Sequence, residues 1–344
     1  MKNVCNSDRV RERFELIVNG PALFNAVVAA LEYGLFAFLS QHPKTSAENI
    51  AQFTGLRSDK LRPLLQALCA TELIEKKDGY YENSAVAEEL LVTDGDDSWR
   101  HILLGWQNIY YPAFGHMTSA LRDGTNTKAL AAFKGTEATL YQRLAHDPER
   151  QAIFHAAMSA FTLRSINGLI ESPEFLSVRH LLDVGGNDGT TASRLLERYP
   201  TMNITIFDLP SVTETSVKAY GERLKLHSGD LFSDPFPQDA DTILFSHVLE
   251  IFSEEQIIFL LSKAYAALPA GGKVLIYGYN VSDDETRGLY SARLSLYLNV
   301  LASGQGMAYP AKDWENWLGK AGFSRLSTVT GLPYEHGLNI GWKE

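Results

Sequence analysis

The apolar positions divide the chain into a helical first part and a strand-rich second part. In the first 100 residues they recur at helical spacing, and residues 14–39 carry more of them than one helical face can hide. Such surface has to be buried against the rest of the chain or against a second copy. Residues 101–172 are again helical in pattern, whereas short β-rich runs alternate with helical stretches from Pro173 onward. That alternation is typical of a parallel sheet with crossover helices.

Residues 45–83 have the order helix, turn, helix and hairpin. A short helix ends at Gly55, apolar positions follow at helical spacing, and Asp78-Gly79 is a strong signal for a two-residue hairpin turn. This order resembles a winged-helix unit. Residues 46–82 hold five basic and six acidic residues, a net charge of −1, so they offer no basic face for a nucleic-acid groove. We therefore expect a structural or dimerising role.

The pattern predicts an α/β protein: a Rossmann-like, mostly parallel sheet with helices on both faces, preceded by a mainly helical domain that contains the winged-helix unit. We place the helical dimerisation domain at residues 1–100, a helical linker that contributes to a substrate pocket at 101–172, and the Rossmann-like domain at 173–344.

Composition and charge narrow the function classes. The chain has 344 residues, 45% apolar and 21% charged, which is ordinary for a globular protein. Its formal charge of −10 disfavours nucleic-acid binding. The polar N-terminus has no signal-peptide pattern, and we expect no apolar span of about 20 residues, hence a cytoplasmic protein without a membrane partner. Cys5 and Cys69 cannot form a disulfide framework, and no Cys/His cluster predicts a metal site.

A glycine turn carries the clearest chemical signal. The apolar run ending in Asp183-Val184 leads into Gly185-Gly186-Asn187-Asp188-Gly189, and a helical stretch follows at once. Nineteen residues after Gly189, the next predicted strand ends in Asp208, placed to accept hydrogen bonds from ribose hydroxyls. The glycine spacing is not the dinucleotide pattern, and a carboxylate at 183 would sit poorly beside a pyrophosphate. The loop suits an adenosine ligand with a positive charge and no phosphate, which describes S-adenosylmethionine.

Four segments make the resemblance specific. LLDVGGNDG, FDLPSV, the GDLF of residues 229–232 and HVLEIFSEEQ are together similar to class I S-adenosylmethionine-dependent methyltransferases, in particular the small-molecule O-methyltransferases of plant phenolic and bacterial natural-product metabolism. The resemblance covers nearly the whole chain. It implies an enzyme with S-adenosylmethionine as cofactor, a small-molecule methyl acceptor, and a homodimer formed through the N-terminal domain.

The resemblance also implies site residues. Asp183, Gly185, Gly186 and Gly189 would line the methionine end of the cofactor, Asp208 would bind the ribose and Asp230 the adenine amino group, and Phe232 would pack on the adenine. Neighbouring positions complete the expected cofactor site: Leu209, Leu231 and Ser246. Asn187 replaces a common glycine, and Asn tolerates the left-handed conformation.

The family's catalytic histidine is missing. This family usually carries His-Asp-Trp after the fourth strand, and in register Glu250 holds the histidine position here. His247 lies three residues earlier and would face elsewhere if this segment ends a strand. A solvated Glu is a poor base for a phenol, because their pKa values are about 4.3 and about 10, although burial can raise the pKa of Glu. A nucleophile that carries no proton needs no base.

Three hypotheses follow. The preferred one is methylation of a thioether sulfur, as in methylthio-hydroxybutyrate S-methylation, or of a heterocyclic nitrogen, with Glu250 and aromatic faces stabilising the product cation. The second is an O-methyltransferase on a phenol or carboxylate that uses Glu250 or His247 as base, and the third is a non-catalytic S-adenosylmethionine-binding regulator. Loss of the His-Asp pair argues against metal-assisted C-methylation. Candidate substrate residues are Tyr110, Tyr111, His155, Met158, Phe161, Arg164 and Tyr297, with Arg293 as a further candidate for a substrate carboxylate.

Overall fold

The computed structural model describes residues 2–213 and 221–344, with the side chains of 2–6 and 211 left aside. The chain forms two compact units, one of residues 1–108 with 153–160 and the other of residues 109–152 with 161–344. Residues 109–152 thus join the unit that holds the large sheet, because their short helices pack against a π-helical turn at 298–302. From the sequence we expected all of residues 101–172 to form one helical linker that contributes to a substrate pocket.

The first unit contains a small antiparallel sheet and the predicted helix–turn–helix–hairpin order. Its strands run in the order β1-β3-β2, and the β2–β3 turn has Asp78 and Gly79 at φ 51° and 85°, as a type I′ hairpin requires. The elements are α1 (Lys2–Glu32), α2 (Leu35–Gln41), β1 (Thr45–Ser46), α3 (Ala47–Thr54), α4 (Ser58–Ala70), β2 (Ile74–Lys77), β3 (Tyr80–Asn83), α5 (Ala85–Leu91) and α6 (Trp99–Gly105).

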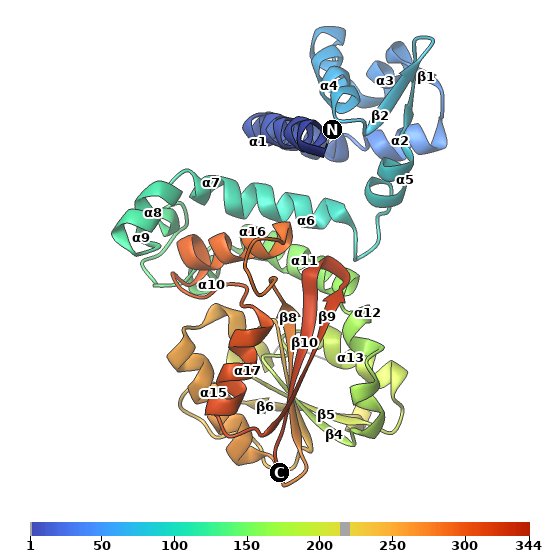
Figure 1. Ribbon diagram of the computed structural model, residues 1–344. Coiled ribbons are helices and arrows are strands. Elements are labelled where there is room, and N and C mark those ends of the chain that lie inside the picture. The colour runs from blue at the N-terminus through green and yellow to red at the C-terminus, as the bar shows by residue number, and fades with distance from the viewer. Residues whose placement is uncertain (1, 214–220) are drawn as a thin grey trace. The chain divides into compact units, whose positions relative to one another are not determined.

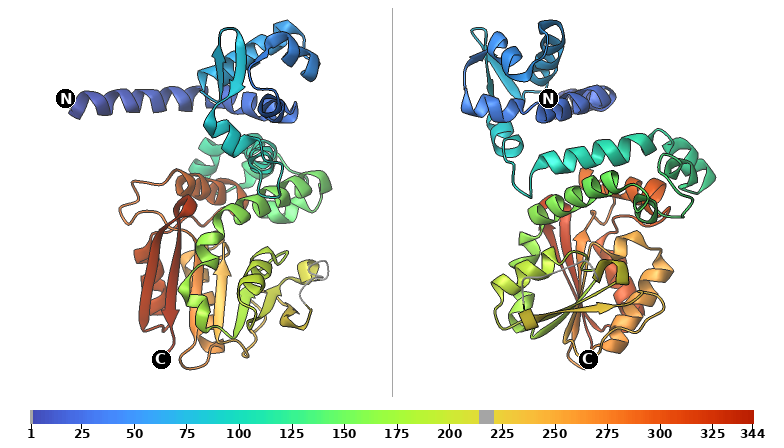
Figure 2. Two further views of the ribbon diagram at one scale, coloured as in Figure 1. Left: turned by 90° about the vertical axis from the view of Figure 1, so that its right-hand side faces the viewer. Right: turned by 180° about the vertical axis from the view of Figure 1, so that it is seen from behind.

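Helix α1 is only half covered within its own unit (Figure 2). Its second half packs into the apolar core, whereas five apolar side chains of the first half are more than half exposed: Val10, Phe14, Leu16, Ile17 and Val18. The expectation that no segment reaches the length and apolarity of a membrane span is wrong here. An 18-residue stretch within residues 7–32 passes that test by length and composition, with a mean hydropathy of 1.6 and 17% of the stretch buried, because the polar residues of α1 are concentrated at its start.

The second unit is built on a seven-stranded sheet of order β6-β5-β4-β7-β8-β10-β9 (Figure 1). The first five strands in that order are parallel, and β10 runs antiparallel to both β8 and β9. The strands are β4 (His180–Val184), β5 (Asn203–Asp208), β6 (Leu224–Ser228), β7 (Thr242–Ser246), β8 (Lys273–Tyr279), β9 (Arg325–Leu332) and β10 (His336–Trp342). The predicted Rossmann-like α/β fold is confirmed.

Helices cover both faces of this sheet (Figures 1 and 2). One apolar core joins the sheet to α15 and α17, and a second core joins the other face to α12 and α13. Their bounds are α12 (Asn167–Ile170), α13 (Thr190–Arg198), α14 (Pro210–Thr213), α15 (Glu254–Ala267), α16 (Leu289–Tyr297) and α17 (Ala311–Lys320). Both cores consist of apolar side chains.

The remaining helices and helical turns connect these layers. They are η1 (Trp106–Tyr110), α7 (Tyr111–Phe114), α8 (Met117–Asp123), α9 (Thr127–Leu130), α10 (Leu140–Leu144), α11 (Pro148–Ser165), η2 (Pro173–Ser177), η3 (Gly221–Arg223), η4 (Leu249–Ile251), η5 (Leu298–Ala302) and η6 (Pro333–Glu335). Of these, η4 and η6 lie directly beside strand ends and carry the side chains described next.

Candidate active site

The loop after β4 leaves no room for a side chain at Gly185 or at Gly186. Gly185 has φ 75°, and its N–H donates to the carbonyl of Phe207 (2.8 Å). A Cβ at Gly185 would lie 2.6 Å from Val248 Cγ2, and one at Gly186 would lie 2.7 Å from Asp183 Oδ2. Gly189, at φ 79°, sits directly before α13. A loop of bare backbone next to a helix N-terminus lets a ligand approach closely.

Asp208 ends β5 beside this loop. Its Oδ2 accepts from the N–H of Asn187 (2.9 Å), and its Oδ1 accepts from the N–H of Leu209 (2.8 Å). Asn187 has φ 49°, the left-handed conformation expected for it. Each carboxylate oxygen can accept a second hydrogen bond, so Asp208 is held in place with capacity for ligand hydroxyls.

Asp183 is a buried carboxyl group that lacks a partner. The residue is 1% exposed, and neither oxygen has a hydrogen-bond partner in the described part of the chain. Burial and, secondarily, the charge of Asp208 raise the pKa of Asp183 to about 7. An isolated buried carboxylate is costly, and a cationic group bound over the loop would remove that cost. The site therefore fits a cationic ligand such as S-adenosylmethionine.

The turn after β6 adds an exposed apolar face at the same edge of the sheet. Asp230 Oδ1 accepts from the backbone N–H groups of Phe232 (2.8 Å) and Ser233 (3.0 Å), which lower the pKa of Asp230. The Phe232 ring packs edge-on against Phe252 at 5.2 Å and is still 37% exposed. Leu209 is also exposed, whereas Leu231 packs against the core.

The turn after β7 places Glu250 in the interior. Strand β7 ends at Ser246, and Glu250 in η4 is 5% exposed. Its Oε1 accepts from the backbone N–H of Tyr279 (3.0 Å) at the end of β8. Burial raises the pKa of Glu250 to about 7, although the hydrogen bond from Tyr279 opposes the shift. A carboxyl group with this pKa can accept a proton near neutral pH.

The expectation that His247 faces away from Glu250 is wrong. Nδ1 of His247 lies 3.9 Å from Glu250 Oε1. His247 has φ 57°, so the chain leaves the extended conformation at this residue and its side chain stays on the side of Glu250. Burial and the neighbouring His336 lower the pKa of His247 well below its usual value. The imidazole is therefore neutral.

His336 is a site residue that the sequence analysis did not identify. Its ring lies 4.9 Å from that of His247 and 4.5 Å from that of Tyr279. Nδ1 donates to the carbonyls of Pro333 (2.9 Å) and Tyr334 (3.1 Å), which leaves Nε2 as an acceptor. Burial lowers the pKa of His336 to about 4. No local sequence pattern marks this residue, because β10 pairs with β8 across a long stretch of sequence and only this pairing brings His336 next to Tyr279.

Three predicted substrate residues gather near Arg293. Its guanidinium donates to the hydroxyl of Tyr110 (2.7 Å) and to that of Tyr279 (3.3 Å), and the rings of Tyr110 and Tyr297 are 4.9 Å apart. The ring of Phe161 lies 6.0 Å from that of Tyr279.

The other predicted substrate residues lie outside this cluster or stay predictions. Burial raises the pKa of Tyr290, whose ring packs on Phe161, and the charge of Arg164 is a minor opposing contribution. Tyr111 is 39% exposed. His155 and Met158 belong to the first compact unit, so their place in a substrate pocket stays a prediction.

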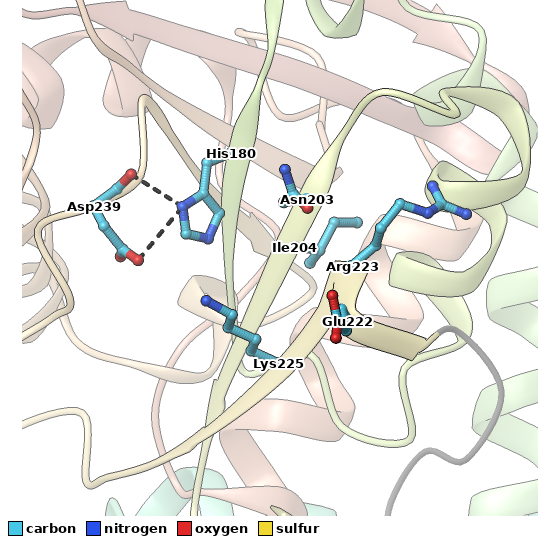
Figure 3. Close-up of a pocket in the computed structure, with 7 residues that line it drawn as sticks. All are labelled: His180, Asn203, Ile204, Glu222, Arg223, Lys225 and Asp239. Carbon is cyan, nitrogen blue, oxygen red and sulfur yellow. Dashed lines mark hydrogen bonds and ion pairs between the residues drawn. The ribbon is translucent and has the colours of Figure 1, made fainter.

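A cavity of about 240 Å³ opens at the opposite, amino-terminal edge of the sheet (Figure 3). Both nitrogens of its His180 are engaged, Nδ1 with the carbonyl of Asp239 (3.0 Å) and Nε2 with Thr205 Oγ1 (2.9 Å). Within residues 2–213 and 221–344, no three His, Cys, Asp or Glu side chains come together as a possible metal site.

The fold and the groups at the carboxyl edge of the sheet define an S-adenosylmethionine-dependent methyltransferase of class I. The chain belongs to the O-methyltransferase family: residues 114–324 match the family's O-methyltransferase domain and residues 16–93 its dimerisation domain.

Similar proteins agree with this assignment. The chain is 32% identical to the L-tyrosine C(3)-methyltransferase of Streptomyces lavendulae over 90% of this chain and 85% of that protein. It is 30% identical to the 3-hydroxy-5-methyl-1-naphthoate 3-O-methyltransferase of Streptomyces sahachiroi over 88% and 86%. The crystal structure of the S-adenosylmethionine-dependent methyltransferase SibL in its apo form superposes with a TM-score of 0.85 at 31% identity, covering 96% of this chain and 98% of that one. The enzyme class and the cofactor predicted from the sequence are confirmed.

The buried Asp183 makes the stability of the ligand-free protein depend on pH. A carboxyl pKa raised in the folded state means that stability is highest below the unfolded pKa and declines as the pH rises towards 7. We expect the stability of Asp183→Asn relative to the wild type to increase by on the order of 2–3 kcal/mol between pH 5 and pH 8, because the penalty in the wild type grows until the carboxyl group ionises near pH 7. Urea unfolding at both pH values measures this change, and a stability difference that is the same at pH 5 and pH 8 would contradict it.

Proposed function

We propose that this enzyme methylates a small hydroxyaryl acceptor, at the phenolic oxygen or at a ring carbon activated by it, with Glu250 as the base for the phenolic proton. The observation that carries the proposal is the buried carboxyl of Glu250 with a pKa raised to about 7. When bound, S-adenosylmethionine supplies the methyl group as an electrophile.

The raised pKa removes the main objection to a glutamate base. Moving a proton from a phenol of pKa about 10 to a solvated Glu of pKa about 4.3 costs about 8 kcal/mol, whereas a Glu with a pKa near 7 lowers that cost to about 4 kcal/mol. The remaining cost is in the range that a positioned base and a bound cationic cofactor can offset. Glu250 is thus a competent replacement for the missing histidine.

One deprotonation prepares either methylation site. A phenolate shares its negative charge between the oxygen and the ring carbons ortho and para to it, so the atom that faces the methyl group decides the product. Methylation at oxygen is then complete. At carbon, the new C–C bond leaves a hydrogen on that carbon and a ketone at the ring oxygen. Glu250 then returns its proton to the oxygen, and the carbon loses its hydrogen as a proton to water, which restores the aromatic phenol. The two similar Streptomyces enzymes are named for a C-methylation and an O-methylation of hydroxyaryl compounds, which supports this acceptor class.

Arg293 favours an acceptor that carries negative charge. Its guanidinium is largely buried among the hydroxyls of Tyr110 and Tyr279. A buried cation attracts a phenolate or a substrate carboxylate and disfavours the product cation that a thioether or ring nitrogen would form. The alternative is the one preferred from the sequence: methylation of a thioether sulfur or a ring nitrogen, which carries no proton.

We infer that the cofactor lies over the glycine loop, with its charged methionine end near Asp183, its ribose on Asp208, and its adenine between Asp230 and the exposed face of Phe232. Gly185, Gly186 and Gly189 provide the close backbone, and Leu209, Leu231 and Ser246 complete the edge. The unpartnered oxygens of Asp183 and the anchored carboxylate of Asp208 support this placement.

Asp208→Ala should weaken binding of S-adenosylmethionine by about 1–3 kcal/mol, the usual cost of losing a charge-assisted hydrogen-bond partner. Calorimetry with the purified protein measures the change. Asp239→Ala, at the opposite edge of the sheet, is the matched control and should bind as the wild type does. Equal affinity of the Asp208 variant and the wild type would refute the ribose assignment.

The pH profile tests the role of Glu250. With L-tyrosine and a hydroxynaphthoate as acceptors, the rate of the wild type under chemistry-limited conditions should rise with pH and level off above about 7, as the carboxyl ionises. Glu250→Gln keeps the shape and removes the proton affinity, so turnover should fall about 10²–10⁴-fold. Formation of S-adenosylhomocysteine measures both.

A proton-free acceptor would give a different result. Thioether and pyridine-type acceptors in the same assay should then be methylated at a rate that is flat between pH 7 and 9, and the hydroxyaryl acceptors should be inert. That outcome would overturn the hydroxyaryl proposal and restore the sulfur or nitrogen acceptor.

We further propose that the chain forms a homodimer through its N-terminal domain. The match to the dimerisation domain and the exposed apolar side chains in the first half of α1 support this. Light scattering at micromolar concentration should report about twice 38.2 kDa.

Ile17→Asp places a charge among these side chains and should shift the protein towards the monomer. Leu176→Asp changes an equally exposed leucine in the other unit (76% against 74%) and should leave the mass unchanged. A wild-type protein that stays monomeric would contradict the dimer.

A further inference from the structure

We propose that Gly278 is a positioning residue for Glu250: the side chain missing at position 278 creates the space that the carboxyl group occupies. This inference rests on the proposed role of Glu250 as base. Gly278 belongs to β8 and is neither part of the glycine loop nor one of the predicted substrate residues. We expect it to act only through Glu250.

The first argument is steric. A Cβ at Gly278 would lie 1.8 Å from Glu250 Oε1 and 2.7 Å from its Cδ. Gly278 does not have a positive φ, so the backbone conformation does not require glycine there. It lies within β8, whose residues are buried throughout. The space needed by the carboxyl group is the reason the structure offers for a glycine near the end of this strand.

The second argument is the hydrogen bond that the same space permits. Parallel pairing between β7 and β8 ends at Ser246 and Tyr277. Past that point the N–H of Tyr279 is donated to Glu250 Oε1 at 3.0 Å instead of to a strand. The carboxyl group thus continues the edge of β8 where β7 stops, and it reaches this N–H only because position 278 has no side chain.

The backbone of the turn that carries Glu250 has no room to shift away from position 278. A Cβ at Gly306 would lie 2.1 Å from the carbonyl oxygen of Glu250, and one at Gly185 would lie 2.6 Å from Val248 Cγ2. The segment 248–251 is therefore packed against bare backbone on two further sides. A methyl group at 278 has to rotate the Glu250 side chain away from the N–H of Tyr279, because the turn itself has no room to shift.

Gly278→Ala is the test. We expect kcat with L-tyrosine or a hydroxynaphthoate to fall at least 10²-fold, with calorimetric affinity for S-adenosylmethionine within about twofold of the wild type. In ¹³C NMR of the Glu-labelled protein, the Glu250 carboxyl, assigned by its loss in Glu250→Gln, should titrate at least one pH unit lower in the alanine variant, because it leaves its buried position.

Shortening the glutamate should reverse the effect. Aspartate retracts the carboxyl group by one methylene, so Gly278→Ala combined with Glu250→Asp should be at least tenfold more active than Gly278→Ala alone. A change that merely disturbed the sheet would not be rescued in this way. Gly341→Ala, a glycine of β10 whose added Cβ would lie 3.0 Å from Leu318 and Phe323, is the control for tight packing in the same sheet and should keep kcat.

The outcomes separate this inference from the proposed function. If Glu250→Gln is inactive while Gly278→Ala keeps its kcat and its Glu250 titration, the positioning role is refuted and the base stands. If Glu250→Gln is fully active, the base is refuted, and the positioning role with it. Should Gly278→Ala fail to fold, Gly278→Ala with Glu250→Ala must restore folding, because the clash is with the carboxyl group; continued misfolding would overturn the proposal.

Discussion

The close packing of the turn after β7 against bare backbone is the constraint on which the site depends. Gly185, Gly278 and Gly306 each face this turn at distances that leave no space for a methyl group. Gly185 belongs to the glycine loop and Gly278 to β8, so the loop, the strand end and Glu250 are held in one arrangement. Since packed interiors do not deform freely, the position of the carboxyl group is coupled to that of the loop over which we place the cofactor.

Two carboxyl groups at the carboxyl edge of the sheet are buried, and their surroundings differ. Asp183 has no hydrogen-bond partner in the described residues, whereas Glu250 accepts one backbone N–H. Burial raises the pKa of both to about 7. The ligand-free protein is destabilised by their ionisation, and such cost at a functional site is expected when binding or catalysis requires it. A bound cation would satisfy Asp183, and a proton from the acceptor would satisfy Glu250.

Neutral imidazoles and a buried guanidinium lie in the same part of the second unit as Glu250. His247 and His336 are held neutral by burial, and the guanidinium of Arg293 lies against the hydroxyls of Tyr110 and Tyr279. Because burial lowers the pKa of both imidazoles, they are weaker bases than the carboxyl group and do not compete with it for a proton. Together with the guanidinium, this charge pattern supports the hydroxyaryl acceptor that we propose over the proton-free nucleophile preferred from the sequence.

The sequence by itself determined the α/β fold and the glycine loop with Asp208, and it predicted Glu250 at the position of the family histidine. These are local signals: apolar periodicity, glycines at a strand end, and a residue in register with a motif. The tertiary structure alone decided the burial that raises the pKa of Glu250, the place of His247 beside it, and the closeness of His336 and Gly278 to these groups. A pKa depends on what surrounds a group, and the antiparallel β10 brings His336 to this edge from far along the chain. In the sequence Gly278 is an ordinary strand glycine. Only the structure shows that the carboxyl group of Glu250 occupies the space of its missing side chain.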